Sequence, residues 1–204
     1  MKQLLLVFFT ALFAFANAQS PISIGINTSF DLTTQHPKPL FVKPWIGYQL
    51  GVKLKYDLNK NFALITGFNH QNQGARIDYS KLIMSDGSKP KSGDIYEKIS
   101  QVPLMLSYYT GSKVRFGFNI GMAYNFLYRV NANVTFQNEE ILSFTSTSSN
   151  QFITGLFSFG AECTLNRTTF RVEPNVAYKF IDMEGPSPNY FNVGLGASVY
   201  YRLK

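Results

Sequence analysis

The sequence predicts an all-β protein: an eight-stranded antiparallel up-and-down transmembrane β-barrel with short periplasmic turns and longer extracellular loops. Three observations lead to this prediction. The N-terminus reads as an export signal, eight later segments alternate apolar and polar residues, and short and long connections alternate between the segments. Hydrophobic residues make up 45% of the 204 residues and charged residues only 15%, against about 25% charged residues in an average soluble domain, which excludes a disordered chain.

The first 18 residues have the parts of a secretory signal peptide. Lys2 precedes an apolar stretch of about a dozen residues, and Ala16-Asn17-Ala18 forms a small-residue cleavage pattern. This stretch is too short to cross a membrane as a helix. We therefore expect residues 1–18 to be a signal peptide and residues 19–204 to form one exported barrel domain. Cys163 is the only cysteine, so the domain has no intrachain disulfide and no cysteine-rich metal site.

Eight segments show the period-two alternation of β-strands. In each, large apolar side chains occupy one face, and Gly, Ser, Asn and a few charges occupy the other. The segments supply about 8 to 17 residues, close to or above the roughly 9–11 that a tilted strand needs to cross a bilayer. Pro103 and Pro174 fall inside segments, where we expect a bulge or a weakened hydrogen-bond ladder. The segments are 22–32, 46–58, 62–73, 101–108, 114–130, 153–165, 170–180 and 191–203.

The connections between segments alternate in length. Turns at 57–61, 110–113 and 165–168 are tight, whereas the other four connections have about 12, 24, 20 and 9 residues. Short turns on one rim and long loops on the other are typical of outer-membrane barrels. An even number of strands then places both ends of the barrel domain at the periplasmic rim.

Alternation alone leaves open whether the apolar face points to lipid or into the cavity of a soluble, lipocalin-like barrel. Residue size favours lipid, because the many Phe, Tyr, Leu, Ile and Val side chains could not fit inside eight strands. Aromatic residues such as Trp45, Tyr108 and Tyr128 also fall near segment ends, where interfacial girdles belong. The predicted location is therefore the bacterial outer membrane.

Four motifs resemble the PorT-like family of bacterial outer-membrane β-barrels. They are Gly47-Tyr48-Gln49-Leu50-Gly51, Gln73-Gly74-Ala75, Gln101-Val102-Pro103-Leu104-Met105-Leu106-Ser107-Tyr108-Tyr109 and Phe191-Asn192-Val193-Gly194-Leu195-Gly196. The resemblance covers nearly the whole domain after the signal. It implies an eight-stranded barrel with periplasmic termini. It also implies a link to protein secretion, because the named member of that family is tied to a secretion system.

Charged residues on the polar face gather near the predicted periplasmic turns. A charge inside a closed barrel must be paired or hydrated. We therefore predict that opposite charges form one linked ion-pair cluster in the lumen and plug it. Its predicted members are Arg115, Glu162, Arg171, Glu173 and Arg202. The alternative is a gated ion or proton path, which eight strands could support only if those pairs rearranged.

The connection from about Gly74 to Glu97 mixes turn residues with sizeable apolar ones. A purely solvated loop would not carry five such side chains close together. We predict that they pack on one another or on a partner, and that residues 76–78 continue the alternation as an exposed hairpin. The candidate interaction residues are Ile77, Tyr79, Leu82, Ile83 and Met84.

These features favour a non-enzymatic barrel that acts as a surface interaction protein or as an accessory of protein secretion or envelope assembly. The alternatives are a membrane enzyme with an extracellular-rim site, with His70 as base beside Asp78, Asp94 or Ser80, and a soluble ligand-binding barrel. His36 is the only other histidine, and the spacing specifies no catalytic, cofactor or metal site. The expected partners are outer-membrane lipid, lipopolysaccharide through loop lysines and arginines, and secretion or envelope proteins. We expect a monomer that binds no nucleic acid and no cofactor.

Overall fold

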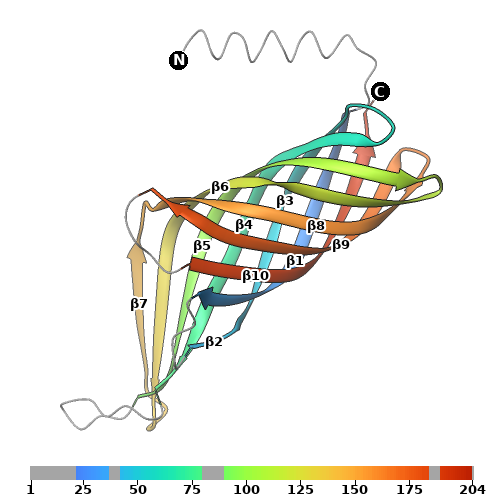
Figure 1. The fold of residues 1–204 in the computed structure, drawn as a ribbon. Coiled ribbons are helices and arrows are strands. Elements are labelled where there is room, and N and C mark those ends of the chain that lie inside the picture. The colour runs from blue at the N-terminus through green and yellow to red at the C-terminus, as the bar shows by residue number, and fades with distance from the viewer. Residues whose placement is uncertain (1–21, 37–41, 80–89, 184–188, 204) are drawn as a thin grey trace.

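The structure is a computed structural model that describes residues 22–36, 42–79, 90–183 and 189–203 (Figure 1). The expected signal peptide lies outside the described residues. The described chain forms ten β-strands in one antiparallel sheet. They are β1 (Ile22–His36), β2 (Val42–Lys43), β3 (Trp45–Asp57), β4 (Phe62–Asp78), β5 (Pro90–Gly111), β6 (Val114–Phe136), β7 (Ile141–Thr147), β8 (Gln151–Leu165), β9 (Thr168–Asp182) and β10 (Asn189–Arg202).

Eight of these strands form a ring. Each pairs with its neighbours in the order β1, β3, β4, β5, β6, β8, β9, β10, and β10 pairs back onto β1. The pairing of β1 with β10 runs from Ser23 opposite Arg202 to His36 opposite Asn189. The ring confirms the predicted all-β, antiparallel up-and-down barrel. The two other strands, β2 and β7, are short and pair with β4 and β6.

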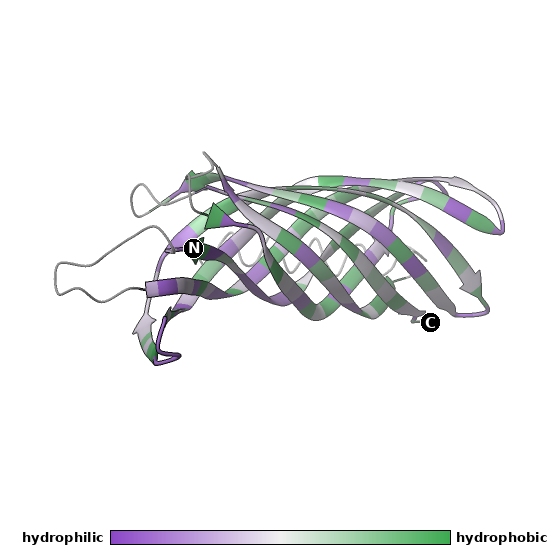
Figure 2. Cartoon of the chain, turned by 90° about the horizontal axis from the view of Figure 1, so that it is seen from below, coloured by the Kyte–Doolittle hydropathy of each residue, from purple (hydrophilic) through white to green (hydrophobic). Residues whose placement is uncertain are grey.

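Hydrophilic and hydrophobic residues alternate along the strands of the ring (Figure 2). In the structure this alternation gives the barrel an inside and an outside. Large apolar side chains point outward and are exposed; Ile120, for example, is 64% exposed and Leu195 is 58% exposed. Polar side chains such as Asn119 and Ser107 point inward and are fully buried. This is the reverse of a water-soluble domain and suits a barrel whose outer surface contacts lipid. Among the described residues, no helix is long and apolar enough to span a membrane.

The two ends of the ring differ, as the connection lengths predict. We call the end with the connections 58–61, 112–113 and 166–167 the turn end, and the opposite end the loop end (Figure 1). Local chemistry closes the tight turns. The Asn59 side chain accepts hydrogen bonds from the backbone N–H groups of Asn61 and Phe62, at 2.8 and 2.9 Å. Gly111 takes a φ of 107°, which favours a residue without a side chain.

The two prolines inside strands weaken the ladder without forming bulges. Pro103 stays in register with Ala123 on β6, but the pairing between β4 and β5 skips it. Pro174 likewise pairs with Leu195 on β10 and is skipped between β8 and β9. The weakened ladder is therefore confirmed, and the alternative of a bulge at these positions is wrong. The register shifts lie elsewhere, at Pro90/Ser92, Lys98/Ile99 and Ile153/Thr154.

Three strands on one side of the ring are longer than predicted. The pairing of β4 with β3 ends at Asn72, and the pairing of β6 with β8 ends at Phe126, yet β4 continues to Asp78 and β6 to Phe136. The prediction that 131–150 is only a connection is wrong, because it contains the end of β6 and all of β7. We call the projecting sheet the loop-end extension; it comprises residues 42–43, 73–78, 90–98, 129–136 and 141–147.

Candidate functional site

The barrel interior near the turn end holds a network of charged side chains. Glu162 on β8 is its centre: it contacts Lys55 at 3.2 Å, Arg171 at 3.8 Å and Arg115. Arg171 also lies 2.9 Å from Glu173. Four of the predicted cluster members are thus brought together inside the lumen. The predicted Arg202 lies at the edge, 3.5 Å from Asp57, which is itself 3.5 Å from Lys55.

Polar neighbours complete this network. The Glu173 carboxylate accepts hydrogen bonds from Lys53 at 3.1 Å, Ser158 at 2.9 Å and Asn119 at 2.7 Å. Arg171 donates to the Tyr109 hydroxyl at 2.6 Å. These bonds offset part of the cost of removing buried charges from water. The network therefore occupies the turn end of the lumen, and we call it the plug.

Small residues make room for the large ones in this interior. Gly117 lies beside the ring of Tyr109, and a Cβ built at Gly117 would sit 2.7 Å from that ring. Lys55 in turn places its ammonium group 4.3 Å from the centre of the Tyr109 ring, a cation–π contact. The glycines on the polar face are therefore packing positions inside the barrel.

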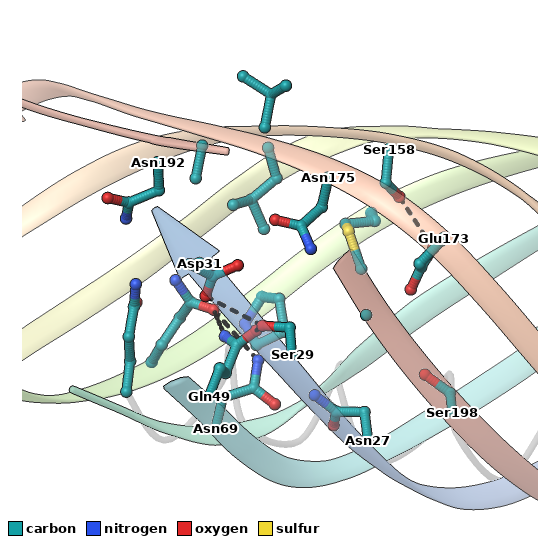
Figure 3. A pocket seen from close by; sticks show the side chains of 18 of the residues that line it. Asn27, Ser29, Asp31, Gln49, Asn69, Ser158, Glu173, Asn175, Asn192 and Ser198 are labelled. Atoms are coloured by element: carbon teal, nitrogen blue, oxygen red, sulfur yellow. Dashed lines mark hydrogen bonds between the residues drawn. The ribbon is translucent and has the colours of Figure 1, made fainter. Parts of the chain in front are cut away.

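A small cavity of about 60 Å³ lies beside Glu173 and Ser158 of this plug (Figure 3). Asp31 and Ser29 of β1, which are 3.0 Å apart, line it together with Gln49 and Asn69. Some buried oxygens on its walls have no hydrogen-bond partner within the part of the chain that the structure describes, among them Asn27 Oδ1 and those of the side chains of Asn192 and Ser198. A polar cavity of this kind is suited to a few ordered waters.

Further toward the loop end, hydrogen bonds and then apolar side chains close the lumen. Glu97 accepts hydrogen bonds from Gln73 and from the Tyr190 hydroxyl, both at 3.1 Å. Beside them is a buried apolar cluster, which consists of Ile99, Leu127 and Phe152 with Val130 packed against it. The interior is thus occupied along its length by ion pairs, amides and finally apolar groups.

The loop-end extension is amphipathic. Directly opposed residues of an antiparallel sheet share a face, so the pairing defines rows across β4, β5, β6 and β7. The rows that continue the face of Glu97, which is turned to the lumen, are apolar. They are Ala75–Ile95–Ala132–Phe144 and Val42–Ile77–Gly93–Val134–Leu142.

The opposite face of the extension is polar and carries ion pairs. Lys43 lies 2.8 Å from Asp78, and Arg76 makes two hydrogen bonds to Asp94, at 2.6 and 3.1 Å. These hydrogen bonds, together with the charge of Asp94, raise the pKa of the Arg76 guanidinium above its ordinary value. The apolar face and the polar face distinguish this sheet from a solvated loop.

Replacing Arg76 by alanine is expected to lower the free energy of unfolding by no more than about 1 kcal/mol. Both partners are partly exposed, and water screens exposed ion pairs. The measurement is urea unfolding in lipid vesicles at low and high salt. A loss of several kcal/mol would contradict the view that this pair only solubilises the outer face of the extension.

The predicted interaction residues fall only partly within the described ranges. Ile77 lies in β4 on the apolar face of the extension, and Tyr79 packs against Gly93. Leu82, Ile83 and Met84 lie outside the described residues. Pairing of β4 with β5 from Ala75 to Asp78 confirms that the flanking strands extend as a hairpin beyond the ring.

The structure does not bring together the alternative catalytic site at His70. His70 points outward from β4, and its Nδ1 lies 3.1 Å from the Tyr128 hydroxyl. Its supposed partners Asp78 and Asp94 contact Lys43 and Arg76 instead. The side chain of His36 and the residue Ser80 lie outside the described part of the chain. Within the described ranges, no three His, Cys, Asp or Glu side chains gather in a way that could hold a metal ion.

Sequence reasoning placed two lysines of this network on the lumen-facing side without including them in the predicted cluster, and it missed strand β7. The cluster prediction omitted Lys53 and Lys55, although their inward positions on β3 are visible in the alternation. Strand β7 gave a weaker signal, because Ile141-Leu142-Ser143-Phe144-Thr145-Ser146-Thr147 is rich in Ser and Thr. Its β-branched and aromatic residues would have supported a strand there.

Several solved structures are similar to this chain. The chain is similar to a major outer membrane protein from Thermus thermophilus, with 14% identity over 91% of this chain and 100% of that chain and a TM-score of 0.54. It is similar to Neisserial surface protein A, with 10% identity, 87% and 96% coverage and a TM-score of 0.49. It is also similar to Ail, the attachment invasion locus protein of Yersinia pestis, with 15% identity, 90% and 99% coverage and a TM-score of 0.46. No curated protein matches it significantly.

A family model covers nearly the whole chain. The model of the outer membrane protein beta-barrel domain matches residues 15–203. The ring of strands, the apolar exterior and the likeness to the Thermus fold agree with it. The chain therefore belongs to the outer membrane protein beta-barrel domain family and is a protein of the bacterial outer membrane.

Proposed function

We propose that this barrel is a non-enzymatic surface interaction protein that acts through its loop-end extension. The observation that carries the proposal is the extension itself: β4, β5, β6 and β7 project beyond the ring with one apolar and one polar face. The ring closes without this extension, because its strands already pair with their neighbours between the turn end and residues Asn72 and Phe126. With periplasmic turns, the extension lies on the extracellular side.

A finer role is as an accessory of protein secretion or envelope assembly. The motifs that resemble the PorT-like family support this role. The interior supports it too, because ion pairs and apolar groups fill the lumen and favour binding at the surface over passage through the barrel. The proposed partners are envelope or secretion proteins and outer-membrane lipid. Lipopolysaccharide phosphates are a further candidate, because Lys43 is largely exposed at the extension. The barrel acts as a monomer.

Removing the tip of the β4–β5 hairpin tests this function. Ala75 and Ile95 are directly opposed, so residues 76–94 can be replaced by an Asn-Gly turn without changing the register below. We expect the barrel to assemble, as measured by heat-modifiable gel mobility, and native partners to be lost from cross-linked outer membranes. A matched control shortens the turn-end connection 58–61 by one residue. Recovery of every native partner at normal yield from the hairpin variant would contradict the proposal.

A further inference from the structure

The two edges of the loop-end extension are built differently. On one side β2 covers the edge of β4, and this short strand carries Lys43 and is followed by Pro44, two features that discourage further pairing. On the other side β7 is the last strand, and among the described residues β6 is the only strand that pairs with it. The extension thus has one protected edge and one open edge.

The open edge arises from unequal strand lengths. β7 and β8 lie in succession along the same side of β6, with Thr147 opposite Arg129 and Gln151 opposite Phe126. β9 flanks β8 but ends at Asp182, opposite Phe152. Among the described residues, the ring therefore provides no strand to continue beside β7, which forms the margin of the projecting sheet (Figure 1). All seven residues of β7 are exposed.

The backbone groups that face the open edge can be identified. The Phe136 N–H donates to the carbonyl of Glu140 at 2.9 Å, and the Ser148 N–H donates to the carbonyl of Tyr128 at 3.3 Å. Consecutive residues of an antiparallel strand direct their N–H and C=O groups to opposite sides. Even-numbered residues of β7 therefore bond to β6, and odd-numbered residues, such as Ser143 and Thr145, present their N–H and C=O groups at the open edge.

Side chains on β7 do not protect this edge. The strand contains no charge and no proline, and its apolar face ends in Leu142 and Phe144, which are 46% and 58% exposed. An edge of this kind is a template for another strand. Charges flank it: Glu139 and Glu140 lie at its tip, and Arg129 lies opposite its last residue.

We propose that β7 binds an extended polypeptide segment of a partner protein, which adds as a further antiparallel strand. This inference rests on the proposed function and names the partner's chemistry. The segment has apolar side chains at alternate positions, which continue the rows of Leu142 and Phe144. It has a basic residue at the end near Glu139 and Glu140 and an acidic residue at the end near Arg129.

A second copy of this chain does not fit the same edge. Two barrels in one membrane are related by a two-fold axis along the membrane normal. That rotation turns the apolar face of one extension to the side on which the other copy has its polar face. Edge pairing between copies would therefore put the apolar face of one extension, which carries Phe144, on the same side as the polar face of the other, which carries Ser143. The apolar rows could not continue from one copy into the next.

A designed peptide provides the direct test. The barrel is reconstituted in phosphatidylcholine nanodiscs and titrated with the fluorescent peptide Glu-Thr-Val-Thr-Val-Thr-Val-Thr-Lys, followed by anisotropy. Ser143→Pro removes an edge N–H without removing a bond to β6, and Ser143→Ala is its matched control. We expect Ser143→Pro to weaken binding at least about tenfold, a loss of about 1.4 kcal/mol, and Ser143→Ala to change it less than about twofold.

Two further readouts sharpen this test. N-methylation of alternate peptide bonds should abolish binding, and the Ser143 and Thr145 amides should gain protection from hydrogen exchange when the peptide is bound. The proposal is wrong if the peptide does not bind at millimolar concentration, if Ser143→Pro binds as wild type, or if the N-methylated peptide binds equally well. Dimers that Ser143→Pro disrupts would instead identify a second copy as the occupant and also overturn it.

Cross-linking in native outer membranes separates this inference from the proposed function. A photoreactive residue replaces Ser143 at the open edge or Asp94 on the polar face of the extension. Capture of partner proteins at position 143 with alternating cross-link sites along one extended segment supports strand addition. Capture at position 94 alone leaves the surface interaction function standing and overturns strand addition at β7, and capture at neither position contradicts both.

Discussion

Replacing Glu162 by glutamine is expected to lower the free energy of unfolding by about 3–5 kcal/mol. The Glu162 side chain is 1% exposed and contacts Lys55, Arg115 and Arg171. Removing its charge takes a carboxylate partner from all three cations and leaves Lys55 with Asp57 and Arg171 with Glu173, and loss of one partner from a buried ion-pair network costs about this much. The measurement is urea unfolding in lipid vesicles, with the folded fraction read from heat-modifiable gel mobility.

Two further variants separate charge from packing. Glu139→Gln makes the same chemical change at an exposed turn and should alter stability by no more than about 0.5 kcal/mol. The double variant Lys55→Met, Glu162→Gln removes one cation together with the carboxylate, so it should recover part of the loss. If Glu162→Gln unfolds as wild type does, the ion-pair network does not stabilise the barrel.

Replacing Ile120 by lysine is expected to cost about 2–4 kcal/mol of folding free energy in the membrane. Ile120 is the middle residue of the part of β6 that pairs with β8, Val114–Phe126, and its side chain points outward. A charge there has to leave water for the hydrocarbon core. The same vesicle-based unfolding measures the cost.

The matched control is Ile141→Lys, a substitution in the part of the protein outside the membrane. Ile141 on β7 is 60% exposed, close to the 64% of Ile120, but belongs to the loop-end extension. Ile141→Lys should change stability by no more than about 0.5 kcal/mol, because its side chain already contacts water. Equal losses from the two lysine variants would contradict the assignment of the ring to the lipid phase and of the extension to the aqueous phase.

The sequence by itself determined the strands of the ring and their two faces. Alternation is a local property, so positions such as Ile120 and Asn119 could be assigned to the outside and the inside from their neighbours alone. The tight turns were equally local, because residues such as Asn59 and Gly111 close them. The inward positions of the charges followed from the same pattern, and with them the expectation of ion pairs.

The tertiary structure decided which inward residues meet. Lys53 and Glu173 are 120 residues apart and lie within 3.1 Å only because closure of the ring brings β3 and β9 to face each other across the lumen. Register shifts had the same effect at the loop end. The shift between Lys98 and Ile99 lets Val130, which strict alternation along β6 assigns to the lipid-facing set, pack against Ile99 and Leu127 inside the barrel.

The projecting sheet also depended on tertiary pairing. Whether β6 ends near Val130 or continues to Phe136 is settled by the presence of β5 on one side and β7 on the other, because a strand persists only where a neighbour satisfies its backbone groups. The open edge of β7 is likewise set by where β9 ends, at Asp182. Local alternation determined which face a residue takes between register shifts, and non-local pairing determined where those shifts fall, how far each strand extends and where an edge is left open.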